Sequence, residues 1–169
     1  MGGFKRTIGW PFVFLILIYS YGSQAMSMTD LGKVCLFSNI SGVILIDGKP
    51  VKNAKLVRTV DLSGKEIDEA RTDENGHFEM PAVFARTITK YLPQEFSSYQ
   101  EIVVHYNNTA YRIWSAVKRK PEENIEARGK PLIIKCELNS EETMIKVNNS
   151  PIFSLCIWDV EPDKRRKAF

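Results

Sequence analysis

The chain has 169 residues, of which 44% are hydrophobic and 25% are charged. These values are typical of one globular domain with a hydrophobic core, and they argue against a disordered chain. The formal net charge is +3, and it falls to +1 without Lys5 and Arg6. Because nucleic-acid binding needs a strongly positive surface, we expect no nucleic acid among the partners.

Residues 1–25 have the build of a signal peptide. Lys5 and Arg6 precede an apolar run from Ile8 to Ile18, and Ser23-Gln24-Ala25 offers small residues at a cleavage position. A short membrane anchor is the alternative, but residues 8–21 are too few to cross a hydrocarbon core of about 30 Å comfortably as a helix. We therefore expect an exported protein, which meets a membrane only through this segment if the segment is uncleaved.

Short strands divided by turns follow a lead-in at residues 26–40. Asp47-Gly48 and Asn107-Asn108 favour the positive φ angles of two-residue hairpin turns, whereas residues 139–151 show no clear pattern. Apolar alternation predicts strands within Val43–Ile46, Val51–Val60, Ile67–Thr72, His77–Met80, Glu101–Tyr106, Thr109–Lys118, Pro131–Leu138 and Ile152–Trp158.

Many short strands with hardly any amphipathic helix imply an all-β, antiparallel sandwich of the Greek-key type. We assign the β-sandwich domain to residues 41–160 and a basic C-terminal tail to residues 161–169. A helix is expected in the leader, with at most one helical turn in the connection at residues 86–99.

One strand carries a charge on its apolar face. Arg58 interrupts the row formed by Ala54, Leu56 and Val60, so the inward register of this strand is weakly specified. An edge position or a β-bulge would accommodate the charge.

The acidic turn Asp73-Glu74-Asn75-Gly76 is predicted to be a structural corner. Asp and Asn side chains bond nearby backbone N–H groups, and Gly76 can take the left-handed conformation that closes the turn. A calcium loop is the alternative, drawing on Asp73, Asn75 and Glu79. These ligands are too few for an ion that takes six to eight oxygens.

The three cysteines are interpreted in the light of export, because oxidising compartments allow disulfides to persist. Cys136 and Cys156 lie in two apolar segments near the C-terminus, and we predict that they pair. Cys35 is then buried, free, or the true partner of one of the others. The chain lacks a Cys/His cluster with metal-ligand spacing, so neither a metal nor another cofactor is expected.

Two stretches carry a resemblance to a known family. The run from Ser41 to Leu56, with its Gly-x-Pro-Val-x-x-Ala corner, and the run from Thr72 to Phe78, with Thr-Asp-x-x-Gly-x-Phe, resemble carboxypeptidase regulatory-like, or transthyretin-like, β-sandwich modules. Residues 100–114 and the two paired cysteines also look like an uncharacterised exported bacterial domain family. The resemblance implies a transthyretin-like or immunoglobulin-like sandwich that binds protein or carbohydrate, and it transfers no catalytic residue.

Catalytic chemistry has weak support in the sequence. His77 and His105 are the only imidazoles, and both lie on predicted strands where a solvent-facing role is commoner. A cluster of acids could form the paired carboxylates that glycosidases use, but it is better explained as a solvated loop; it comprises Asp61, Glu66, Asp68 and Glu69. We expect no enzyme, with a hydrolase of unrecognised site as an alternative.

One hairpin gathers the residue types that dominate protein interfaces. Tyr106, Tyr111, Arg112 and Trp114 form the candidate binding patch, unless Trp114 belongs to the core. The sequence thus predicts a non-catalytic binding module of the bacterial periplasm or cell envelope, with secretion as the alternative location. Its expected partner is another protein, a toxin that it caps as an immunity protein or an envelope component. A carbohydrate-binding module is the alternative.

Overall fold

The computed structural model describes residues 32–87 and 95–164. The predicted leader and its helix lie outside the described residues, as does the end of the basic tail. Within the described part, no helix is both long and apolar enough to cross a membrane.

Strands make up most of the described chain, with one short 3₁₀ helix, η3, at Ile125–Ala127. The strands are β1 (Lys33–Phe37), β2 (Ile40–Ile46), β3 (Lys49–Pro50), β4 (Lys55–Asp61), β5 (Lys65–Arg71), β6 (His77–Met80), β7 (Val83–Arg86), β8 (Ser98–Tyr106), β9 (Thr109–Lys118), β10 (Leu132–Glu137), β11 (Thr143–Val147), β12 (Ser150–Ser154) and β13 (Cys156–Trp158).

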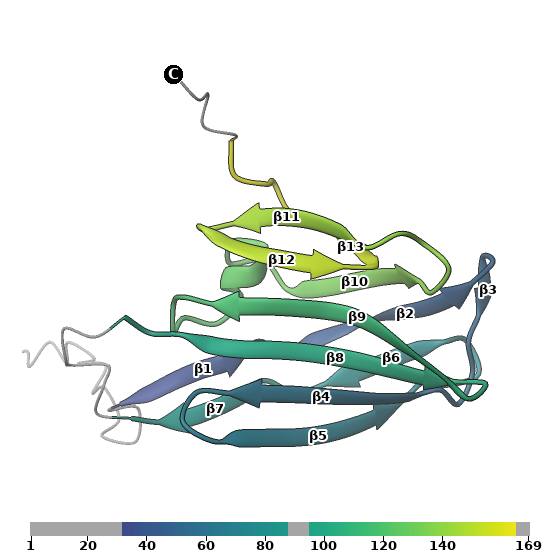
Figure 1. Ribbon diagram of the computed structural model, residues 1–169, viewed down its shortest axis with the longest axis horizontal. Coiled ribbons are helices and arrows are strands. Elements are labelled where there is room, and N and C mark those ends of the chain that lie inside the picture. Colours follow the sequence, from purple (N-terminus) through teal and green to yellow (C-terminus); the bar gives the residue numbers. More distant parts are fainter. Residues whose placement is uncertain (1–31, 88–94, 165–169) are drawn as a thin grey trace, which may run out of the picture.

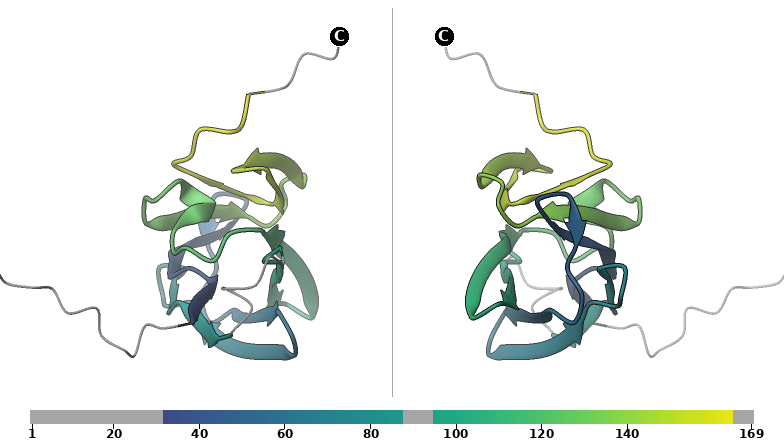
Figure 2. Two further views of the ribbon diagram at one scale, coloured as in Figure 1. Left: turned by 90° about the vertical axis from the view of Figure 1, so that its left-hand side faces the viewer. Right: turned by 90° about the vertical axis from the view of Figure 1, so that its right-hand side faces the viewer.

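Two larger sheets pack against each other, which confirms the predicted all-β sandwich. One sheet has the order β13-β10-β2-β3, with β6 also paired to β2, and the other has the order β11-β12-β9-β8-β4-β5. Figure 1 shows the long strands β4, β5, β8 and β9 side by side, with β2 and β6 behind them. The end-on views of Figure 2 show the sheets curving around a shared interior. Strands β1 and β7 form a separate antiparallel pair.

The core between the sheets consists of alternate residues of both, as the pleat of a strand requires. Ile40 and Ile44 of β2, Leu56 of β4, and Ile102 and Val104 of β8 are all 0% exposed. One pair departs from the antiparallel rule, because β2 runs parallel to β10 over six residue pairs from Leu132↔Ile40 to Glu137↔Leu45.

The predicted turns are confirmed. Asp47 and Gly48 have φ of 51° and 71°, and Asn107 and Asn108 have φ of 48° and 61°. In the acidic corner, the Oδ1 atom of Asp73 accepts hydrogen bonds from the N–H groups of Asn75 and His77, both at 2.8 Å. The stretch is therefore a structural corner whose carboxylate is engaged by its own backbone.

The explanation expected for Arg58 is wrong. Strand β4 lies between β5 and β8 in continuous register, so it is neither an edge nor bulged. Arg58 points inward with the rest of its row and is 0% exposed. Its guanidinium forms two hydrogen bonds to Asp68, at 2.9 and 2.5 Å, and one to the carbonyl of Pro81 at 2.7 Å. The buried charge is thus neutralised by a bidentate pair, the arrangement that suits a guanidinium best.

Several strands lie where none was predicted. Strand β1 falls within the predicted lead-in, and its residues Val34 to Phe37 are buried. Strand β11 occupies the stretch without a clear pattern, and β7 follows β6 after a short turn. Sequence alternation missed β1 because consecutive residues of this strand are buried, so it lacks the period of two that marks a half-exposed strand.

The predicted disulfide between Cys136 and Cys156 is confirmed. The chain leaves one sheet at the end of β12 and enters the other at β13, with Leu155 between them. Cys156 is the first residue after this change of sheet and lies opposite Cys136 on β10. Cys35 is free and buried.

Candidate functional site

The predicted patch is not one surface. Arg112 is exposed and binds Glu142 at 2.9 Å, and Tyr106 and Tyr111 are half-buried. Trp114 is 0% exposed. Trp114 therefore belongs to the core, the alternative that the sequence left open, and it cannot contact a partner or stack on a sugar.

A β-bulge in β9 is the physical reason. Ile102 of β8 faces Trp114 and Val103 faces Arg112, which leaves Ile113 as the extra residue on β9. An extra residue reverses the faces on which all later side chains lie. Trp114 consequently points inward, where its ring centroid lies 6.0 Å from that of Phe37 and 5.0 Å from that of Trp158.

The other predicted candidates do not assemble into a site. His77 and His105 are both exposed, on strands β6 and β8 of different sheets. Among the four acids of the predicted cluster, Asp68 is bound to Arg58, and Glu66 and Glu69 are exposed. The described residues hold no group of three His, Cys, Asp or Glu side chains that could bind a metal ion.

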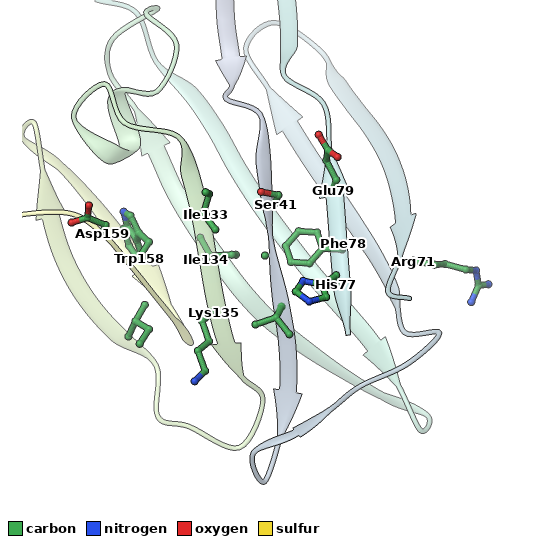
Figure 3. Close-up of a pocket in the computed structure, with 13 residues that line it drawn as sticks. Ser41, Arg71, His77, Phe78, Glu79, Ile133, Ile134, Lys135, Trp158 and Asp159 are labelled. Atoms are coloured by element: carbon green, nitrogen blue, oxygen red, sulfur yellow. The ribbon is translucent and has the colours of Figure 1, made fainter. Parts of the chain in front are cut away.

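The outer face of the β13-β10-β2-β6 sheet carries an open groove of about 750 Å³. Strand register arranges its side chains in two rows across the sheet. One row contains Ile133, Ser41 and Glu79, and the next contains Ile157, Lys135, Val43 and His77. Figure 3 shows Asp159 and Glu79 toward one end of the groove, and Lys135 and His77 toward the other.

The groove joins an apolar floor to separated charges. Ile133 and Ile157 are 61% and 71% exposed, which is unusual for isoleucine. At the acidic end, Asp159 already binds Lys130 at 2.7 Å, and Glu79 accepts a 3.4 Å hydrogen bond from Asn39. Lys135 has no ion-pair partner within residues 32–87 and 95–164. This surface can receive an apolar side chain and a carboxylate together.

A second feature lies inside the sandwich and is called here the inner polar cluster: Ser38, Gln100, Lys118 and Glu126. All four residues are less than 5% exposed. Glu126 accepts hydrogen bonds from Lys118 at 2.9 and 3.0 Å, from Ser38 at 2.6 Å and from Gln100 at 2.8 Å. The carboxylate is therefore saturated with donors, as a buried charge must be.

Cys35 borders the inner polar cluster. Its Sγ atom lies 3.8 Å from the Nζ atom of Lys118 and 4.0 Å from the Oγ atom of Ser38. Burial raises the pKa of the Cys35 thiol, although the Lys118 ammonium partly opposes this shift. Cys35 and the inner polar cluster together combine a thiol, a hydroxyl group, an amine and a carboxylate. All of these groups are buried, so a substrate in solution cannot contact them in this conformation.

Sequence reasoning missed both features. Glu126 stands in a charged loop that is typical of a protein surface, and Lys118 points inward only because of the bulge at Ile113. The groove had a partial signal, since Ile133 and Lys135 alternate with the buried Ile134 and Cys136. The side chains from β2 and β6 that lie beside them depend on the order of strands in the sheet, and alternation within one strand does not predict that order.

Comparison with known proteins places the chain in a family. The sequence profile of a domain of unknown function (DUF6795) matches residues 40–141, more than half of the chain. The protein belongs to this family. No curated protein and no solved structure matches the chain.

Proposed function

We propose that the protein is a non-catalytic interaction module, exported to the bacterial periplasm or cell envelope, that binds another protein through the groove. The observation that carries the proposal is the pair of exposed isoleucines, Ile133 and Ile157, beside Lys135, for which the described residues supply no ion-pair partner. Contiguous apolar surface rimmed by polar residues is typical of protein interaction sites.

The groove defines the chemistry of the partner. A protein segment that places an apolar side chain over Ile133 and Ile157 and a carboxylate near Lys135 would complement it. Burying the two isoleucines would supply binding free energy, and the charge would fix orientation. An immunity protein that caps a toxin is the concrete version of this role.

Export rests on the leader and on the disulfide. The resemblance of the first strands to transthyretin-like modules, which bind without catalysis, favours the same role. A disulfide is stable in an oxidising compartment and rare in a reducing one.

Capture and reconstitution with matched variants test the proposal. The tagged full chain is cross-linked in intact cells, and each captured protein is purified and titrated against wild type. Ile157→Asp and Lys135→Glu should each weaken binding by roughly tenfold or more. Met144→Asp is the control, because Met144 is 57% exposed on β11, outside the groove.

Two outcomes would contradict this function. One is a purified partner that binds wild type and both groove variants equally. The other is a failure to capture any protein, together with a failure to protect cells against a toxin encoded beside this gene.

A further inference from the structure

The inner polar cluster places an amine, a carboxamide and a carboxylate in contact, away from water. The Oε1 atom of Glu126 accepts hydrogen bonds from the Nζ atom of Lys118 at 2.9 Å and from the Nε2 atom of Gln100 at 2.8 Å. One oxygen therefore touches both the nitrogen that can attack a carbonyl and the nitrogen that can leave it. We propose that Lys118 and Gln100 become joined by an intramolecular amide cross-link, with Glu126 transferring the protons. This inference is independent of the proposed binding function.

Backbone register brings the two side chains within reach. Gln100 on β8 faces Ala116 on β9, and Lys118 is the next residue of β9 on the same face. Such diagonal neighbours have Cα atoms about 7–8 Å apart. The lysine side chain is long enough to span this separation, and it already reaches the carboxylate that holds Gln100.

The carboxamide of Gln100 is fixed and polarised. Its Oε1 atom accepts a hydrogen bond from Nε1 of Trp114 at 3.3 Å, and its Nε2 atom also donates to the carbonyl of Leu36 at 2.7 Å. A donor aimed at the carbonyl oxygen stabilises the negative charge that develops there when a nucleophile adds. The buried indole thus acts on the reacting carbonyl.

The reaction needs no oxidant or other co-reactant. Lys118 passes a proton to Glu126, which gives a neutral amine and a carboxylic acid. Nζ then bonds to Cδ of Gln100, and Glu126 protonates Nε2 as the Cδ–Nε2 bond breaks and ammonia leaves. Nζ returns one further proton to Glu126, so a secondary amide, ammonia and a neutral carboxylic acid remain.

Two features of the site favour this product. First, the cross-link replaces the buried ion pair of Lys118 and Glu126, which is costly to desolvate, with uncharged groups. A void of about 10 Å³ lies beside Gln100, Lys118 and Glu126, close to the smallest space that holds one water-sized molecule. Ammonia is of that size.

Mass spectrometry of the full chain tests the proposal directly. The expected intact mass is lower by about 17 Da, the mass of the ammonia lost, than the mass calculated for the chain from its observed N-terminus, beyond the change due to the disulfide. Proteolysis after reduction should yield one branched peptide in which Lys118 is linked to Gln100. Glu126→Gln keeps the shape of the side chain but removes the proton carrier, so this variant should retain the full mass.

A second variant guards against a failure of Glu126→Gln to fold. Lys118→Met removes the nucleophile and leaves an apolar side chain of similar length, and it too should retain the full mass. Three outcomes overturn the proposal: wild type of unchanged mass after a day at 37 °C, a 17 Da loss that maps to another residue, and an 18 Da loss that maps to a bond between Lys118 and Glu126.

Discussion

Gly42 in β2 is a residue whose missing side chain the fold requires. A Cβ atom at this position would lie 2.0 Å from the carbonyl oxygen of Ile134 on the neighbouring strand β10. That oxygen is backbone within the parallel ladder, so it cannot move without breaking strand pairing. We expect Gly42→Ala to lower the free energy of unfolding by about 3 kcal/mol or more in urea titrations.

Gly64 is the matched control for this substitution. A Cβ atom there would meet no atom within 4 Å, and the residue lies in the turn between β4 and β5. Gly64→Ala should therefore change stability by less than about 0.5 kcal/mol. Equal effects of the two substitutions would refute the close approach of β2 and β10.

Cys35 is predicted to be a slow thiol in the folded protein. It is 2% exposed, and burial raises its pKa above the ordinary value. Because the thiolate is the reactive form, a raised pKa leaves less of it at neutral pH. Alkylation by iodoacetamide at pH 7.5 should be roughly tenfold slower or more than in urea-unfolded protein, and should accelerate only at higher pH. Equal rates in folded and unfolded protein would show that the thiol is accessible.

At the scale of elements, Asp163 fastens the segment after β13 to the β11–β12 hairpin. Its carboxylate accepts hydrogen bonds from the N–H groups of Asn149 at 2.7 Å and Asn148 at 3.0 Å, and from Arg128 at 2.6 Å. The N–H group of Asn149 is the main reason that the pKa of Asp163 lies below its ordinary value, and Asn148 and Arg128 add to the shift. We expect Asp163→Asn to lower the free energy of unfolding at pH 7 by about 1–2 kcal/mol.

The pH dependence of this contribution has a definite sign. A carboxyl group with a lowered pKa in the folded state stabilises the protein above its unfolded pKa of 3.8 and loses this effect as pH falls through the folded value. The difference between wild type and Asp163→Asn should therefore shrink below about pH 4. Asp159→Asn is the control, since the Asp159 side chain is 85% exposed and its pair with Lys130 should contribute less than about 1 kcal/mol. If wild type and Asp163→Asn still differ by the same free energy of unfolding at pH 2, the ionised Asp163 carboxylate is not the source of the stabilisation.

Turns were the elements that sequence reasoning located best, because their chemistry is local. Asn107-Asn108 marks the β8–β9 hairpin, and the same dipeptide at Asn148-Asn149, with φ of 51° and 67°, marks the hairpin that was missed. The bulge at Ile113 had no local signal, since it depends on how β9 packs against β8. That single residue explains why Trp114 and Lys118 both point into the core, which strand alternation alone does not reveal.

At the scale of the whole molecule, the family match and the candidate features coincide only in part. The matched residues 40–141 include β2, β6 and β10, and also Gln100, Lys118 and Glu126. Strand β13, which supplies Ile157 to the groove, lies beyond the match. The groove is therefore completed by the segment that the disulfide holds in place.

The disulfide should accordingly contribute to the stability of the whole sandwich. It joins residues 20 apart in sequence, and constraining the unfolded chain over such a loop is worth about 3 kcal/mol. It also fixes β13 to β10 just after the chain changes sheets. We expect reduction, or the double substitution Cys136→Ala with Cys156→Ala, to lower the free energy of unfolding by about 3 kcal/mol.

Cys35 supplies the control for this experiment. Reductant should leave the unfolding midpoint of the double variant unchanged, because Cys35 is free. Thiol counting in urea should give one reactive thiol in the oxidised wild type and three after reduction. The prediction fails if reductant raises the thiol count of wild type from one to three but leaves its unfolding midpoint unchanged. In that case the packing of β13 against β10, and not the disulfide, holds β13 in its sheet. Ile157 follows Cys156 directly. If the groove binds a protein as proposed, reduction under native conditions should weaken that binding.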